Sequence, residues 1–273
     1  MRPVILLSLL AFTAGCAERH GGDAKPATLD DLASRPAAPV APVPAVAAAS
    51  HHAPAGIEPL EALTRLSAGN ARFANAQRTR SAATADDAAE RAATATGQQP
   101  FAAVLTCADS RLPPELIFDQ SIGDLFVVRN AGNLADPIGE GSLEYAIEHL
   151  GVRLIVVLGH GSCGAVKAVS GSDGPLPGHL ADIQRAMPGL RDFAVERGKA
   201  GLAPEGVIAA AVERNATSQA AALLAGSPTL RQAVANGRIA VVPAIYQLAS
   251  GTVGFLPPVP AGSNAPTAPA TTH

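Results

Sequence analysis

Short apolar runs bounded by turn residues recur along the central part of this chain. They are typical of strands buried in a parallel sheet whose two faces are both covered. The predicted strands cover residues 102–106, 124–128, 154–158 and 238–243. Helical stretches lie between them, and this alternation is that of βαβ units. The pattern therefore predicts an α/β fold with a central, mainly parallel β-sheet flanked by helices.

The predicted helices are recognised by apolar positions three or four residues apart and by their boundaries. In the clearest case Leu143, Ile147 and Leu150 share one face, and Gly151 ends the helix. The predicted helices cover residues 59–66, 84–96, 112–118, 140–150, 164–169, 208–224 and 229–235. The first two precede every strand and carry no evident chemistry, so we expect these N-terminal helices to pack on a partner subunit. Residues 245–256 predict a hairpin, or a strand with a turn.

The N-terminus has the pattern of an export signal. Arg2 supplies a positive charge, and the apolar run at residues 4–14 is too short to span a bilayer as a mature helix. Thr13-Ala-Gly-Cys16 resembles a bacterial lipobox, in which the signal is cut before a cysteine that is then lipidated. The lipobox pattern prefers leucine where Thr13 stands. We expect an exported, periplasmic or cell-envelope protein held at a membrane by a lipid on Cys16. Plain secretion and an uncleaved apolar N-terminus are the alternatives.

Composition divides the chain into four parts. They are a signal peptide at residues 1–15, an Ala/Pro-rich tether at 16–55, a folded domain at 56–256 and a disordered tail at 257–273. The tether lacks helical or strand periodicity, so its prolines would make it an extended spacer between an anchor and the folded domain. His51 and His52 at its end are interpreted as solvated rather than as metal ligands.

Composition and charge narrow the class of protein. Hydrophobic residues make up 48% of the 273 residues, but aromatic residues only 3%, and tryptophan is absent. The core must therefore consist of alanine, valine, leucine and isoleucine. The formal charge is −3, with 20 basic and 23 acidic residues and no basic stripe, so nucleic-acid binding has no electrostatic support. Three cysteines are too few for a disulfide framework, which indicates metal or redox chemistry.

Two polar segments follow predicted strands and carry that chemistry. Cys107 follows the first strand, and His160 and Cys163 follow the third. Open α/β sheets gather ligands at the carboxyl ends of their strands. Two thiolates and one imidazole form a zinc-binding set with one position left, as a catalytic zinc requires, and thiolates favour zinc over magnesium or calcium. The alternative is a buried thiol pair or, after export, a disulfide.

Asp109 and Arg111 accompany the first cysteine. An ionised Asp109 could accept a hydrogen bond from a water on the zinc, and Arg111 would hold it ionised through a bidentate pair. If Arg111 swings away, Asp109 could bind the zinc directly and close the site. The alternative is a purely structural salt bridge. For residues 129–133 we favour a loop that braces the site over a direct catalytic role.

Cys107-Ala-Asp-Ser-Arg111 together with His160-Gly-Ser-Cys163 resembles the β-class carbonic anhydrases. The resemblance extends over most of residues 60–256 and includes Arg-Asn-Ala-Gly-Asn at 129–133. It implies that Cys107, His160 and Cys163 bind one zinc ion per chain, with Asp109 and Arg111 as the dyad beside it. It also implies dimers or higher homo-oligomers. A glutamine before the first strand would bind substrate oxygen across the subunit interface; Gln98 matches by position, although Gln99 is adjacent.

The reaction implied by this resemblance is the reversible hydration of CO2 to bicarbonate and a proton, through attack by zinc-bound hydroxide. A relative that hydrates another linear heterocumulene, such as CS2, would need the same zinc set. An anchored zinc- or bicarbonate-binding protein without turnover would lack the dyad, and here Asp109 and Arg111 are both present. His149 and His179 are candidates for a proton shuttle by residue type alone.

Overall fold

The computed structural model describes residues 56–79 and 86–263 of the chain. All of them belong to the compact unit that begins at Pro44. The predicted signal peptide, Cys16, His51 and His52 lie outside the described residues. No helix within the described ranges combines the length and apolar character needed to cross a membrane.

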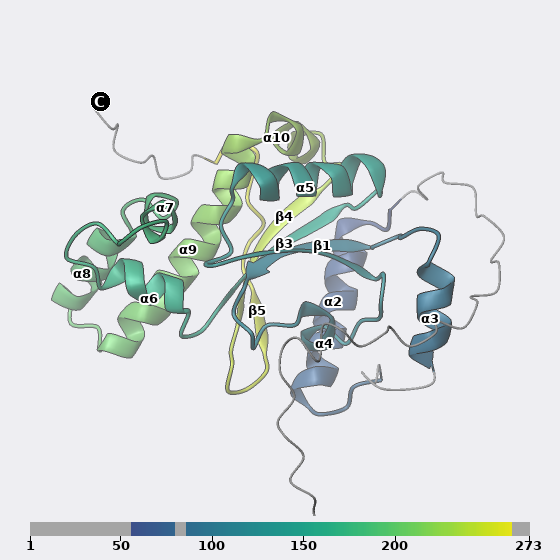
Figure 1. Ribbon diagram of the computed structural model, residues 1–273, viewed down its shortest axis with the longest axis horizontal. Helices are drawn as coiled ribbons and strands as arrows, with labels where there is room; N and C mark the ends of the chain where they lie inside the picture. The colour runs from purple at the N-terminus through teal and green to yellow at the C-terminus, as the bar shows by residue number, and fades with distance from the viewer. Residues whose placement is uncertain (1–55, 80–85, 264–273) are drawn as a thin grey trace, which may run out of the picture. The chain divides into compact units, whose positions relative to one another are not determined.

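A five-stranded sheet organises this unit, with the strand order β2-β1-β3-β4-β5 (Figure 1). The strands are β1 (Ala102–Cys107), β2 (Leu125–Asn130), β3 (Leu154–His160), β4 (Ala240–Tyr246) and β5 (Val253–Phe255). The first four are parallel to their neighbours, and β5 pairs antiparallel with β4 as the predicted hairpin. The α/β fold with a mainly parallel sheet is therefore confirmed.

Two helices precede the first strand, as predicted, and the others lie between the first and the fourth strands, with ends shifted from the predicted ones. They are α2 (Pro59–Ala74), α3 (Asp86–Thr94), α4 (Pro114–Ile117), α5 (Pro137–His149), α6 (Gly164–Ser170), α7 (Leu180–Arg185), α8 (Leu190–Lys199), α9 (Pro204–Gly226) and α10 (Pro228–Ala235). The start of α5 was predicted at Glu140 but lies three residues earlier. Asp136 caps this helix by accepting a hydrogen bond from the Gly139 N–H at 2.7 Å, and Pro137 occupies its first turn.

Both faces of the sheet are covered, which explains the continuous apolar runs in the sequence. Successive side chains of a strand point to opposite faces. On β1, Val104 joins the core cluster that contains Ala62 and Leu66 of α2, whereas Ala103 joins the cluster that contains residues of α5 and α10. Figure 1 shows α5 and α10 along one side of the central strands and α2 and α4 on the other. Helix α9 contributes to both clusters.

The folded domain extends past its predicted end at residue 256. Val259 is 6% exposed, and its N–H donates to the Val241 carbonyl of β4 at 2.9 Å. The prediction of a disordered tail from residue 257 is therefore wrong for this segment, because an apolar side chain among the prolines packs against the sheet. Residues 264–273 lie outside the described part of the chain.

Candidate metal centre

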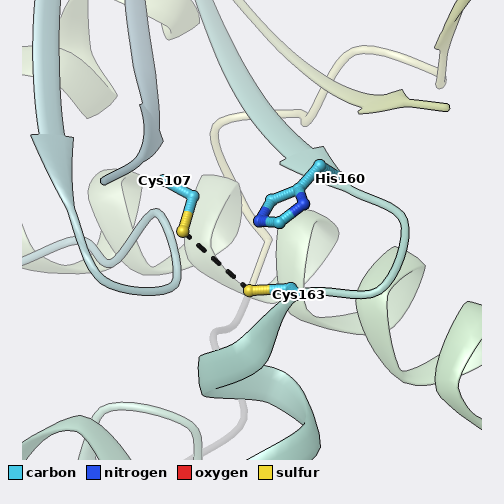
Figure 2. A group of neighbouring side chains, drawn as sticks. All are labelled: Cys107, His160 and Cys163. Carbon is cyan, nitrogen blue, oxygen red and sulfur yellow. Dashed lines mark hydrogen bonds between the residues drawn. The ribbon is translucent and has the colours of Figure 1, made fainter. Parts of the chain in front are cut away.

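Strands β1 and β3 bring the two polar segments together. They are adjacent and parallel, with Thr106 opposite Leu158, so their carboxyl ends meet at one edge of the sheet. Cys107 is the last residue of β1 and His160 the last of β3. A tight turn with Ser162 at φ +57° then places Cys163 immediately before α6. Figure 2 shows the three side chains converging from these separate segments.

The three side chains form a buried ligand group. One ligand atom from each of Cys107, His160 and Cys163 lies within 4.8 Å of the others, and the two Sγ atoms are 4.0 Å apart. Both cysteines are free thiols, so the predicted disulfide alternative does not describe this structure. Within the described ranges these residues are the one group of three or more His, Cys, Asp or Glu side chains that could hold a metal.

The orientation of His160 fits a metal ligand. Its Nδ1 lies 2.9 Å from the Gly161 carbonyl oxygen, which accepts a hydrogen bond when Nδ1 carries the proton. That tautomer leaves a lone pair on Nε2, which is buried and has no hydrogen-bond partner. A buried polar atom without a partner is costly, whereas coordination of a cation would satisfy it. The donor set of two sulfurs and one nitrogen is that of zinc.

Hydrogen bonds shift the pKa values of the two cysteines in opposite directions. The pKa of Cys107 is lowered chiefly because the Cys163 thiol donates to its sulfur; burial opposes this effect, and the backbone N–H of Gly132 adds to it. The Gly132 nitrogen lies 3.4 Å from the Cys107 sulfur. The pKa of Cys163 is raised because its thiol proton is hydrogen-bonded to the Cys107 sulfur and because the side chain is buried. A metal cation bound here would replace the proton shared between the two sulfurs.

Asp109 and Arg111 form a close ion pair beside the ligand group. The guanidinium donates from Nε to Oδ1 at 2.9 Å and from Nη2 to Oδ2 at 2.7 Å, and the Arg111 backbone N–H adds a third bond at 3.0 Å. These bonds hold the pKa of Asp109 well below its usual range. Oδ2 also lies 3.9 Å from the unpartnered Nε2 of His160. Asp109 is thus bound to Arg111 next to the ligand group rather than within it.

Arg129 braces this segment from the neighbouring strand β2. Its Nε donates to the Cys107 carbonyl at 3.2 Å, and its Nη2 donates to the Asp109 carbonyl at 2.7 Å. Both contacts are to backbone, so Arg129 fixes the path of the chain through the ligand and the dyad. This is the bracing role that the sequence favoured.

The other sequence candidates lie apart from the ligand group. Gln98 is exposed in the segment before β1. His149 packs against the Tyr145 ring at 5.0 Å, and His179 is fully exposed beside Asp182. Sequence reasoning missed Gly132, whose N–H reaches Cys107, and Asn215, which binds Gly132 from a distant helix. A polar residue in an alanine-rich helix was the available signal for Asn215.

Comparison with known proteins agrees with this geometry. The family profile described as "Carbonic anhydrase" matches residues 102–253. A curated relative, "Carbonic anhydrase 2" of Mycobacterium tuberculosis, is 40% identical over 201 residues, covering 71% of this chain and 90% of the relative. Among solved structures, the Coccomyxa β-carbonic anhydrase in complex with acetazolamide has a TM-score of 0.57 at 29% identity, covering 72% of this chain and 87% of that one. A tetrameric β-carbonic anhydrase of Sordaria macrospora has a TM-score of 0.54 at 30% identity, covering 59% and 83%.

Proposed function

The chain belongs to the β-class carbonic anhydrases, and from that premise we propose that Asp109 and Arg111 serve its catalysis in an exported homo-oligomer. The reaction is the reversible hydration of CO2 to bicarbonate and a proton, with one zinc ion per chain. The observation that carries the proposed site is the unpartnered Nε2 of His160, which lies 3.9 Å from the Asp109 carboxylate in the cluster with Cys107 and Cys163.

Each ligand residue has a defined task. Cys107, His160 and Cys163 would hold the zinc, and three protein ligands would leave one position for water or substrate. A zinc ion held there supplies the positive charge that makes a water molecule acidic near neutral pH. The Gly161 carbonyl keeps His160 in the tautomer that presents Nε2 to the metal.

Asp109 orients the reacting water. Because Arg111 keeps it ionised, Asp109 can only accept hydrogen bonds, and it therefore selects a water that points a hydrogen toward it. This directs an oxygen lone pair away from the carboxylate, where it can attack CO2. Arg129 holds the Asp109 backbone in place through the carbonyl contact at 2.7 Å.

A second copy of the chain completes the proposed assembly. The Sordaria macrospora relative is tetrameric. Here β2 is an edge strand, and Ile138 and Tyr145 of α5 are 81% and 47% exposed. Exposed apolar side chains of this size beside an edge strand favour association. By the family resemblance, Gln98 would bind substrate oxygen in the partner's site.

Export and lipid anchoring rest on the N-terminal sequence. Arg2, the apolar run at residues 4–14 and Thr13-Ala-Gly-Cys16 together support a lipoprotein signal. We place the enzyme in the periplasm or cell envelope, where it would exchange CO2 and bicarbonate outside the cytoplasm. Cys16 would carry the lipid, and the tether at residues 16–55 would connect this anchor to the catalytic domain.

Stopped-flow hydration of CO2, with zinc analysis of the same sample, tests the proposed function. We expect about one zinc per chain and rapid hydration. A zinc-loaded protein that hydrates CS2 but not CO2 would overturn the substrate assignment. A zinc-loaded protein that hydrates neither would be a binding protein, and a folded protein with a Cys107–Cys163 disulfide and no zinc would refute the site.

A further inference from the structure

Helix α9 carries two buried amide side chains that the reaction described above does not use. Asn215 and Gln219 lie one turn apart, and each is 2% exposed in a helix otherwise rich in alanine. Burying an amide is costly unless its donors and acceptors are paired. Their partners therefore show what these side chains hold in place.

Both amides bind the backbone of the loop that follows β2. The Asn215 Nδ2 donates to the Gly132 carbonyl at 2.9 Å, and the Gln219 Oε1 accepts from the Ala135 N–H at 2.9 Å. The Gln219 Nε2 donates to the Ala186 carbonyl at 2.7 Å and lies 3.4 Å from the Asn215 Oδ1. Gln219 thus links the end of the loop to the segment before α8 and also steadies Asn215.

The loop has a conformation that requires such support. Gly132 and Asn133 have φ angles of +90° and +49°, and an asparagine in the left-handed region is strained. A β-carbon at position 132 would overlap the terminal methyl of Met187. In this conformation the Gly132 N–H points at the Cys107 sulfur, 3.4 Å away. The carbonyl oxygen of the same residue, Gly132, accepts the hydrogen bond from the Asn215 side chain.

We propose that Asn215 is a positioning residue of the zinc site, which acts through Gly132 to keep a backbone N–H on the Cys107 sulfur. A hydrogen bond donated to a ligand sulfur withdraws electron density from it, so two electron-rich thiolates neutralise less of the metal's positive charge. Two thiolates donate more negative charge to the metal than histidines would and so weaken the acidification of bound water. The hydrogen bond to Cys107 counteracts this loss. This inference rests on the zinc site of the proposed function.

Asn215→Leu tests the proposal, because leucine has nearly the shape of asparagine and no donor. In the cobalt-substituted protein we expect the sulfur-to-cobalt charge-transfer band to move to longer wavelength, since the Cys107 sulfur regains electron density. We also expect zinc release to a chelator to be about tenfold faster, as for other changes around metal ligands. An Asn215→Leu protein that folds and keeps the wild-type band position would overturn the proposal.

Two further proteins separate positioning from general destabilisation. Leu230→Ala on α10 removes a fully buried side chain from the cluster on the α5 and α10 face. It should lower the melting temperature without moving the cobalt band, and a band that moves equally in this variant would refute the specific role of Asn215. If Asn215→Leu does not fold, Gln219→Leu carries the test, with a smaller shift in the same direction expected and no shift contradicting the proposal. Wild-type protein that binds neither cobalt nor zinc would instead refute the zinc site itself.

Discussion

At the scale of single residues, the protonation state of Asp109 decides whether its carboxyl group accepts or donates a hydrogen bond to water. Its carboxylate receives three hydrogen bonds from Arg111 and lies 3.9 Å from the His160 nitrogen. Because the pKa of Asp109 is held well below its usual range, this carboxylate stays ionised throughout the neutral pH range. It can therefore accept a hydrogen bond from water but cannot act as a proton donor there.

Asp109→Asn should separate zinc binding from catalysis. The three ligands are unchanged, so we expect about one zinc per chain. The amide of asparagine has an NH2 that donates and an oxygen that accepts, so it no longer selects one orientation of the water. We therefore expect kcat/KM for CO2 hydration to fall about 100-fold. Stopped-flow hydration and zinc analysis measure the two quantities. Asp124→Asn is the matched control, because Asp124 pairs with Arg65 at 3.2 Å away from the ligands and should keep full activity. Undiminished hydration by Asp109→Asn would remove Asp109 from the mechanism.

The ligands were predictable from sequence, whereas the contact between Gly132 and Asn215 was not. Cys107 and His160 each end an apolar run, and two adjacent parallel strands bring their ends together. Gly132 and Asn215 are separated by 83 residues along the chain. Their contact depends on how α9 packs against the loop after β2, and no local pattern encodes that packing.

At the scale of elements, helix α5 shows how a cap places a boundary. Asp136 accepts from the Gly139 N–H at 2.7 Å and from the Asn130 side chain at 2.8 Å. The cap therefore joins the helix to the end of β2. Apolar periodicity alone did not place this start, because the first turn contains Pro137 and the exposed Ile138.

Asp136→Ala should destabilise the folded domain. Loss of the cap and of the bond to Asn130 should lower the free energy of unfolding by about 1–2 kcal/mol. Urea denaturation at a fixed protein concentration, with zinc bound, measures the change. Asp136→Asn retains an acceptor for the Gly139 N–H and should lie much closer to wild type. Equal losses in the two variants would show that the cap is not the cause.

Glu140 on the same helix makes stability depend on pH. Its pKa is raised, mainly by burial and also by the negative charges of Glu144 and Asp136. A group whose pKa is higher in the folded chain contributes stability that is full below its unfolded pKa, about 4.3 for glutamate, and is lost as the pH rises through its folded pKa. Glu140→Gln remains neutral and should therefore be more stable than wild type at pH 8, with a difference that shrinks toward pH 5.

Urea denaturation midpoints of Glu140→Gln and wild type at the two pH values measure this difference. Glu196→Gln on α8 is the control, because Glu196 is exposed and its replacement should change the midpoint little at either pH. A Glu140→Gln advantage that is the same at pH 5 and pH 8 would mean that the stabilisation does not come from removing a titrating charge.

At the scale of the whole molecule, the proposed export would expose the zinc ligands to oxidation. Disulfides form and persist in oxidising compartments. The Cys107 and Cys163 sulfurs lie 4.0 Å apart as free thiols, and a metal bound between them would withhold both from oxidation. An exported chain must therefore acquire zinc before these cysteines pair with each other. Whether the chain must bind zinc before its cysteines oxidise therefore depends on the N-terminal export signal.

Cys16→Ser tests whether the N-terminus carries a lipid anchor. If Cys16 carries the lipid, wild-type protein should sediment with membranes, and Cys16→Ser should move to the soluble fraction with its CO2 hydration intact. The catalytic domain should be unaffected because the zinc ligands begin at Cys107. Thr13→Leu is the control, since it restores the residue that the lipobox prefers and should keep the protein on membranes. Membrane fractionation with immunodetection measures both variants. Cys16→Ser protein that remains on membranes would contradict lipid anchoring, because serine cannot form the thioether that carries the lipid.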